Sequence, residues 1–389
     1  MFFAVTNKRD DHFPQTYSLG NLYVNVDDGW NTFETDDSIC IFKGYADNAR
    51  LVDLVEADSF YNQHGNFTVL QYNKQNQTIT VFSDQWRAYR IWYSKDYGLS
   101  NLHKKDSEIW TDDSVIISQD LSIQHNVQDV IGDLPQTHTD LESVLNYAHN
   151  KLLEKTENFL KHNNLPLKVF LTSGSDTMLV YSYIQQLTNK YDMLWERKIE
   201  WNYFYMHNHQ TIHREVPLGL YLHLYNDPCV LASGAPGDEF LVRNPQMVSS
   251  IARYYGVDFW SLFDESPNDY MKDHYEKVFY NYKKPFAPYN LDGLGLPEMV
   301  RHLANINAND AQHWHFCNTY TWTPLRDLDI FKQIVALPLD QLVGQITGAE
   351  ISIELIKRNN PDLLRYMSPD KNANDYLKVL YPMMTKQLA

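Results

Sequence analysis

Cysteine, basic residues and long apolar runs are all scarce in this sequence. Its 389 residues include three cysteines, Cys40, Cys229 and Cys317, which lie far apart and form no Cys-x-x-Cys pair. This spacing argues against a disulfide framework and against a cysteine zinc site. No apolar stretch is long enough to cross a bilayer, and the apolar run at the N-terminus is too short for a signal peptide. We therefore expect a cytoplasmic protein in a reducing compartment, with no membrane association.

The shortage of positive charge limits the kinds of partner. Lys and Arg together number 33 against 49 Asp and Glu, which gives a formal net charge of -16. A surface this negative repels phosphate backbones, so we expect no nucleic-acid partner. Asn66-Phe-Thr68 and Asn76-Gln-Thr78 match the acceptor pattern for N-glycosylation. Without a secretion signal we expect neither site to be modified.

Two domains are the expected organisation for a chain of this length. Residues 1 to about 100 alternate polar and apolar side chains, and the runs 66-NFTVLQY-72 and 78-TITVFS-83 predict a β-hairpin. The charged stretch that follows ends in GDLPQTHTD, and we place a domain boundary near Pro135. The prediction is a β-rich domain over residues 1–135 and a second domain over residues 136–389.

The second half begins with the pattern of an α/β domain. Apolar residues recur at helical spacing over residues 140–164, after an acidic start. The short apolar run 167-LKVFL-171 predicts a strand, and MLVYSYIQQL after Thr177 predicts a helix packed on a sheet. Helix, strand, tight turn and helix in this order are typical of an α/β domain with a parallel sheet.

The turn between that strand and helix is a candidate anion site. Ligands of parallel α/β sheets bind beyond the carboxyl ends of the strands, where the N–H groups of the next helix carry partial positive charge. Small residues let a phosphate approach these donors, and Asp176 can hold the Mg²⁺ that accompanies a nucleotide. The alternative is an ordinary turn in which Asp or Thr caps the helix. The candidate phosphate-binding residues are Thr172, Ser173, Gly174, Ser175, Asp176 and Thr177.

A second apolar strand, in 228-PCVLASGAPGDEF-240, also ends in small residues and is followed by two carboxylates, Asp238 and Glu239. In a parallel sheet both loops would lie at the same edge. There Ser233 and Gly234 could contact phosphate, and Asp176 and Asp238 could share a magnesium ion. The alternative is a glycine and proline loop with a solvated acidic pair.

Four segments carry a resemblance to asparagine synthetases and their relatives. The segment 172-TSGSDT-177 resembles the SGGxDS pyrophosphatase loop of that family, and 233-SGAPGDE-239 resembles its SGEGxDE loop. Residues 321–340 resemble the VPFLD segment and the helix after it, with Pro324 and Asp327 matching. Residues 65–94 resemble a hairpin of the family's glutaminase domain. The resemblance covers most of the chain.

This resemblance implies an α+β sandwich like that of Ntn hydrolases, followed by an α/β parallel-sheet domain of the PP-loop ATP pyrophosphatase type. In such enzymes a carboxylate attacks ATP, giving an acyl-adenylate and pyrophosphate, and an amine or ammonia then displaces AMP to form an amide. The implied cofactors are ATP and Mg²⁺, and the implied partners are a small-molecule carboxylate and an amine or ammonia. The family also carries a C-terminal lysine near the α-phosphate, for which 368-SPDKNANDY-376 offers Lys371. A solvated loop lysine is the alternative.

The departures from the family pattern are as informative as the matches. Its glutaminase domains use an N-terminal cysteine as nucleophile and its free amine as base, but Phe2 stands here. We therefore expect no glutamine hydrolysis and a scaffold role for the first domain, as in the related β-lactam synthetases. Ser173 replaces a glycine, and Pro236 and Gly237 make the second loop unlike that of most relatives. The adenine-binding strand can be placed only loosely, at residues 199–208.

Other functions stay open on the sequence. A relative that has lost adenylation could be a binding or regulatory protein, and a PP-loop enzyme that modifies a nucleobase or tRNA is a further alternative. His207, His209 and His213 could converge on a metal, but histidines at a strand end are more often hydrogen-bonded or solvated. The oligomeric state is open, a homodimer included.

Overall fold

A computed structural model describes most of the first 200 residues and selected later segments. Several predicted features lie outside the described residues: Phe2, Pro135, Thr172, Ser173, His207, His209, His213, Cys317 and Lys371. Of Asp238 the backbone is described and the side chain is not. The described residues are 3–61, 63–84, 91–95, 97–101, 108–110, 114–126, 139–171, 174–195, 203–205, 215–217, 228–234, 237–243, 251, 256, 319–338, 341–342 and 349–367.

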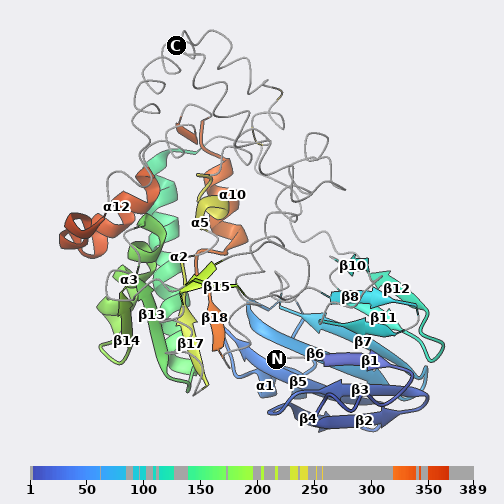
Figure 1. The fold of residues 1–389 in the computed structure, drawn as a ribbon. Helices are drawn as coiled ribbons and strands as arrows, with labels where there is room; N and C mark the ends of the chain where they lie inside the picture. Colours follow the sequence, from blue (N-terminus) through green and yellow to red (C-terminus); the bar gives the residue numbers. More distant parts are fainter. Residues whose placement is uncertain are drawn as a thin grey trace.

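The described residues of the N-terminal part form two six-stranded antiparallel sheets and one short helix, α1 (Leu51–Glu56) (Figure 1). The predicted hairpin is confirmed, with β6 and β7 paired antiparallel from Thr68↔Ser83 to Asn73↔Thr78. The first sheet has the order β10-β8-β9-β1-β3-β2 and the second the order β12-β11-β7-β6-β5-β4. The strands are β1 (Phe3–Thr6), β2 (Gln15–Leu19), β3 (Leu22–Val26), β4 (Asn31–Glu34), β5 (Ser38–Ala46), β6 (Gly65–Asn73), β7 (Thr78–Ser83), β8 (Ile91–Ser94), β9 (Gly98–Ser100), β10 (Glu108–Trp110), β11 (Ser114–Ile117) and β12 (Ile123–Asn126).

The two sheets face each other across one apolar cluster. Phe3 and Val24 from the first sheet share it with Leu70 and Val81 from the second. Because side chains alternate along a strand, the opposite face of the second sheet carries another set, and there Phe67 packs in a cluster with α1. Buried faces on both sides explain why these strands are apolar at most positions.

The second part contains a four-stranded parallel sheet in the order β14-β13-β17-β18, which confirms the parallel architecture expected from the sequence. The described α-helices after residue 140 pack with this sheet around a single apolar cluster (Figure 1). The elements are α2 (Leu141–His162), β13 (Leu167–Leu171), α3 (Ser175–Leu187), β14 (Asp192–Trp195), β17 (Cys229–Ala232), α5 (Gly237–Phe240), β18 (Thr319–Trp322), α10 (Leu328–Val335), α12 (Glu350–Asn359) and the 3-10 helix η4 (Pro361–Tyr366). None of the described helices is long and apolar enough to cross a membrane.

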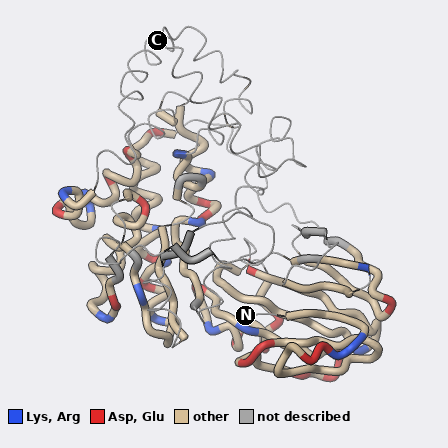
Figure 2. Tube along the Cα trace, in the orientation of Figure 1, with Lys and Arg blue, Asp and Glu red and all other residues tan. Residues whose placement is uncertain are grey.

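Two helices of this part begin at aspartate caps. The carboxylate of Asp140 accepts a hydrogen bond from the Ser143 backbone N–H at 2.8 Å, which starts α2 where the acidic residues predicted. The carboxylate of Asp327 accepts one from the Ile330 backbone N–H at 3.0 Å and starts α10. Charged residues lie mainly at turns and in helices, while the strands are largely uncharged (Figure 2).

One expectation needs correction. The loosely predicted adenine-binding strand at 199–208 does not lie in the parallel sheet: its described part, β15 (Tyr203–Tyr205), pairs antiparallel with β16 (Glu215–Pro217) in a separate ribbon. The strand that follows α3 and pairs parallel with β13 is β14. Its four residues, DMLW, are too short and too mixed in polarity to give a clear strand pattern.

The sandwich and the parallel sheet meet where β5 and β6 lie beside β18. The hydroxyl of Tyr45 donates a hydrogen bond to the Thr321 carbonyl at 2.7 Å, and the amide of Asn66 donates to the same carbonyl at 3.3 Å. The ring of Tyr45 also packs edge-on against Phe159 and Tyr320, with centroids 5.7 Å and 6.0 Å away. These contacts hold β18, and through it the parallel sheet, against the sandwich.

Candidate functional site

The carboxyl ends of β13 and β17 lie side by side. The two strands pair parallel, with Leu167 opposite Val230 and Val169 opposite Ala232. The turn toward α3 and the loop toward α5 therefore leave the sheet at the same edge, as the sequence predicted. The backbone N–H of Ser233 donates to the Trp322 carbonyl at 2.9 Å, which also ties the second loop to β18.

Helix α3 begins at Ser175, directly after the first turn. Its N-cap is Gly174, in an extended conformation with φ -78° and ψ 151°, and a glycine offers no side-chain acceptor. The alternative in which Asp176 or Thr177 caps the helix is wrong, because both lie inside the first turn of α3. Thr177 instead donates from Oγ1 to the Gly174 carbonyl at 3.2 Å. A helix start of this kind can accept an anion at its N–H groups.

The second loop packs onto the first through two glycines. A Cβ on Gly234 would lie 2.5 Å from the Asp176 carbonyl carbon and 2.5 Å from the Thr177 nitrogen. A Cβ on Gly237 would lie 2.5 Å from a carboxylate oxygen of Asp176. Each distance is far below van der Waals contact, so both positions require glycine because of close approach. The two loops predicted to share a site are thus in direct contact at Asp176.

Arg243 also contacts the Asp176 carboxylate. One guanidinium nitrogen lies 2.6 Å from Oδ2 of Asp176, and the other terminal nitrogen donates to the hydroxyl of Ser175. The side chains of Arg243 and Asp176 are 7% and 17% exposed. In a site this sheltered from water, the attraction between the two charges is screened less than on the surface.

A strained residue aims Arg243 at the loop. Val242, which precedes it, has φ 57° and is fully buried in the apolar cluster of the parallel sheet. A β-branched residue rarely adopts the left-handed region, at a cost of about 1–3 kcal/mol, and such residues concentrate at functional sites. The left-handed turn ends the short helix α5 and sends the next side chain back toward α3.

Comparisons with family models and with curated proteins add no evidence about this site. No family model matches the chain, and no curated protein matches it. The resemblance to asparagine synthetases therefore stays a prediction from the sequence segments.

The site residues fit a nucleotide phosphate and its magnesium in part. Gly174, Ser175 and Thr177 surround the start of α3, and Gly234 and Gly237 let the second loop approach it closely at Asp176 and Thr177. Nucleotide-borne Mg²⁺ commonly uses one or two protein carboxylates, and Asp176 supplies one at this edge. In the described part of the chain no group of three or more His, Cys, Asp or Glu side chains gathers in a metal-like arrangement. A dedicated metal cage is thus not seen there, whereas a site for a metal carried in by phosphate is compatible with the donors.

Sequence reasoning missed Arg243 as a member of this site. The signal was a single cation in the otherwise apolar run 240-FLVR-243, directly after the second loop. A charged side chain beside buried residues needs a partner, and the carboxylate of Asp176 provides it. The lysine proposed near the phosphates, Lys371, lies outside the described residues.

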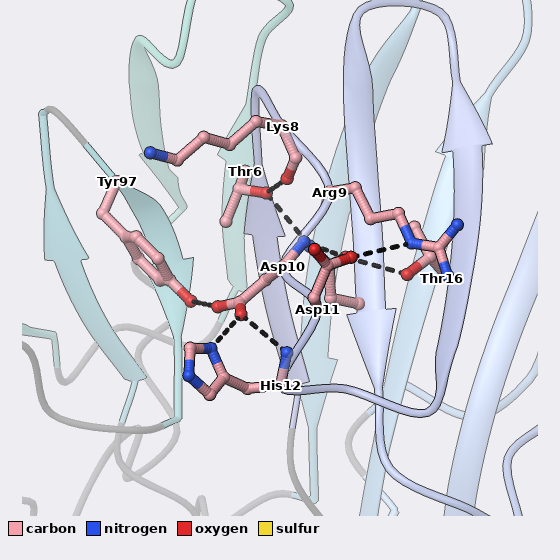
Figure 3. Close-up of polar contacts among 9 residues, drawn as sticks. Thr6, Lys8, Arg9, Asp10, Asp11, His12, Thr16 and Tyr97 are labelled. Carbon is pink, nitrogen blue, oxygen red and sulfur yellow. Dashed lines mark hydrogen bonds and ion pairs between the residues drawn. The ribbon is translucent and has the colours of Figure 1, made fainter.

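A second polar cluster lies at the end of β1 and in the loop after it (Figure 3). The carboxylate of Asp10 accepts a hydrogen bond from the Tyr97 hydroxyl at 2.6 Å and contacts Nδ1 of His12 at 2.7 Å. Asn25 accepts from the Asp10 backbone N–H at 3.0 Å and donates to the Thr6 hydroxyl at 3.0 Å. Burial and the Asp10 carboxylate raise the pKa of Tyr97. These contacts fasten the loop after β1 to its neighbours, which is a structural role.

The start of β1 is equally fixed. The backbone N–H of Phe3 donates to the side-chain carbonyl of Asn101 at 2.9 Å, and the Ser100 hydroxyl donates to the Phe3 carbonyl at 2.9 Å. The residue before Phe3 is Phe2, which has a hydrocarbon side chain. A hydrocarbon side chain cannot attack an amide carbon.

Proposed function

We propose that the chain is an ATP-dependent, AMP-forming amide ligase resembling asparagine synthetase. Its parallel-sheet part would be a PP-loop ATP pyrophosphatase domain over residues 136–389. The observation that carries the proposal is the meeting of two small-residue loops at Asp176, beyond the carboxyl ends of adjacent parallel strands. Sites of phosphate binding in α/β proteins have this architecture.

Each site residue then has a defined task. The N–H groups at the start of α3, flanked by Gly174, would bind phosphate oxygens, with the hydroxyls of Ser175 and Thr177 beside them. Asp176, and Asp238 in the second loop, would hold the Mg²⁺ that neutralises phosphate charge. ATP supplies the activation: a substrate carboxylate displaces pyrophosphate from it, and an amine then displaces AMP. Thr172, Ser173, Ser233, Gly234 and Lys371 complete the proposed site.

The sandwich would be a degenerate glutaminase-like domain of the Ntn type over residues 1–135. Two facing antiparallel sheets with a helix against one outer face support this assignment. The phenylalanine at position 2 removes the nucleophile, so the nitrogen would come from free ammonia or a substrate amine instead of glutamine. The domain would then act as a scaffold for the ligase part.

The decisive experiment is pyrophosphate release from Mg-ATP across a panel of carboxylic acids, each with and without ammonium or simple amines. Release that depends on one acid, and is lost in Asp176→Asn, would support adenylation and identify the substrate class. Asp329→Asn is the matched control, because Asp329 is a half-exposed carboxylate on α10, 3.3 Å from Lys151 and outside the proposed site. A folded protein that binds ATP but releases no pyrophosphate with any acid would contradict the proposal.

A binding or regulatory protein is the second candidate. The ion pair of Asp176 with Arg243 favours it, because this carboxylate already has a cationic partner. In that case nucleotide would bind without turnover, and the sandwich would keep its shape without its chemistry. ATP binding measured by calorimetry, alongside the release assay, separates the two candidates.

A further inference from the structure

We propose that Arg243 and a divalent cation compete for the carboxylate of Asp176, and that phosphate from an incoming nucleotide is what draws the guanidinium away. The inference rests on the proposed function, since it concerns how that same site admits its ligand. Arg243 is then a positioning residue: it acts on the metal through Asp176 and keeps the site closed to free metal.

The geometry of the Asp176–Arg243 ion pair supports the first part of the proposal, that Arg243 keeps free metal off the carboxylate. The guanidinium takes Oδ2 of Asp176 at 2.6 Å, and Gly237 presses against the same carboxylate from the second loop. A metal ion on the same lone pair would have to replace the guanidinium, and one on another lone pair of the carboxylate would be repelled by the nearby positive charge. Free Mg²⁺ also gives up its water reluctantly. The pair therefore resists metal alone.

The position of Arg243 supports the second part, that a nucleotide phosphate draws the guanidinium away from Asp176. Its other terminal nitrogen contacts the hydroxyl of Ser175, the first residue of α3, so the guanidinium already lies at the helix start where a phosphate would bind. Arginine binds phosphate oxygens in a two-pronged manner at least as well as it binds carboxylate. A phosphate at the start of α3 would offer the guanidinium a new partner at the moment when Asp176 gains a metal.

The backbone supports such a shift of the side chain without a shift of the loop. Val242 is fully buried and held in the left-handed region, which fixes the position from which Arg243 projects. An arginine has several rotatable side-chain bonds, so its charged end can move by the few ångströms that separate two neighbouring acceptors. The strain at Val242 is then the cost of placing one cation within reach of both.

The test uses Mn²⁺ alone as the first probe, followed by electron paramagnetic resonance, on the full-length chain. We expect the wild type to bind Mn²⁺ poorly and Arg243→Met to bind one Mn²⁺ at least about tenfold more tightly, because the carboxylate loses its competitor. The gain should vanish in the double variant Arg243→Met, Asp176→Asn. Arg243→Lys keeps the charge and should stay close to the wild type, which guards against an effect of misfolding.

The second probe is Mn-ATP. Here the order reverses: the wild type should bind it, and Arg243→Met should bind it about tenfold less tightly or worse, since the phosphate loses its guanidinium. Arg358→Met is the control, because Arg358 pairs with Glu142 at 2.8 Å on the surface between α12 and α2. It should change neither titration.

The outcomes separate this inference from the proposed function. The inference on Arg243 is overturned if the wild type and Arg243→Met bind Mn²⁺ alone equally. It is also overturned if the two bind Mn-ATP equally. In both cases the proposed ligase function stands as long as pyrophosphate is released. If no variant binds nucleotide although Arg243→Met gains Mn²⁺ through Asp176, the proposed function and the phosphate step are overturned together.

Discussion

The ammonium of Lys155 in α2 lies 3.0 Å from a carboxylate oxygen of Asp327, and both side chains are almost completely buried. Asp327 also caps α10, so its carboxylate connects the start of α10 to the Lys155 side chain of α2. Burial opposes its ionisation, but Lys155 and the Ile330 N–H bring the pKa of Asp327 below its ordinary value. The carboxylate of Asp327 thus stays ionised inside the protein.

Removing one partner of this pair should destabilise the fold strongly. Lys155→Met leaves a buried carboxylate without its cation, and we expect a loss of about 3–5 kcal/mol in the free energy of unfolding. Lys155→Met combined with Asp327→Asn, which keeps an N-cap acceptor, should lose less than Lys155→Met alone. Urea denaturation measures both. The surface pair Arg358 and Glu142 is the control, where Arg358→Met should cost less than about 1 kcal/mol.

A second prediction concerns pH and the two neighbours of that pair, Asp47 and His64, which are joined by a backbone hydrogen bond of 2.9 Å. Burial, with a contribution from Asp327, raises the pKa of Asp47 from 3.8 to about 6 against the opposing effect of Lys155. Burial and Lys155 lower the pKa of His64 from 6.5 to about 3. The charged groups that face the two are Lys151, Lys155, Arg326 and Asp327.

The two shifts have opposite signs in their effect on stability. Between pH of about 4 and 6 the folded state holds a proton on Asp47 that the unfolded state has released, so acidification stabilises the fold through this group. Over the same range the unfolded state holds a proton on His64 that the folded state lacks, so acidification destabilises it. In the wild type the two contributions cancel over this range.

Single variants should reveal the two opposing pH dependences of stability that cancel in the wild type. With Asp47→Asn, stability should fall on acidification relative to the wild type, and with His64→Gln it should rise, by up to about 1.4 kcal/mol per pH unit in each case. The double variant should run parallel to the wild type. Denaturation at intervals from pH 4 to 6 provides the measurement. Four parallel curves would show that neither group has the assigned pKa shift.

Local pattern was enough to predict the hairpin of β6 and β7, the helix α2, and the pairing of two strand ends at one edge. It was not enough for the contacts that join distant segments. The sequence pattern predicted the helix α2 but did not single out Lys155, which lies on its buried face. A lysine on an apolar stripe signals a partner, but only the fold shows that the partner is Asp327, 172 residues away.

The candidate site divides in the same way. The positions of Ser175 and Asp176 at a helix start follow from the order of strand, small residues and helix, which short-range patterns encode. The ion pair with Arg243 joins residues 67 positions apart and depends on a left-handed backbone conformation at Val242. That conformation could not be predicted, because β-branched residues rarely adopt it. Strain of this kind comes from tertiary packing and is invisible in a single sequence.

The junction of the two parts gives a third prediction. Tyr45→Phe removes the hydrogen bond to the Thr321 carbonyl and keeps the ring contacts, so we expect a loss of about 0.5–1.5 kcal/mol. Asn66 donates to the same carbonyl, so the double variant with Asn66→Ala should lose more than the sum of the two single losses. Tyr61→Phe, at an exposed tyrosine, is the matched control. Additive losses in the double variant would contradict a shared acceptor.

The last prediction concerns the contact between the two loops. Gly234→Ala places a methyl group 2.5 Å from the backbone at Asp176 and Thr177, so the second loop or the start of α3 must move. Because an error of about 1 Å at a binding site can cost on the order of a hundredfold in activity, we expect nucleotide binding and pyrophosphate release to fall far more than stability does. Calorimetry with Mg-ATP and urea denaturation measure the two effects.

The control for Gly234→Ala must be a glycine whose substitution strains the backbone at a position remote from the candidate site. Gly29 has φ 81° in a turn of the sandwich, and a Cβ there meets only the Lys43 side chain, at 3.7 Å. Gly29→Ala should therefore cost about 1 kcal/mol of stability and leave nucleotide binding unchanged. If Gly234→Ala loses stability but, like Gly29→Ala, keeps its nucleotide binding, the contact at Asp176 has no special part in binding. If binding alone collapses, the meeting of the two loops is what forms the site.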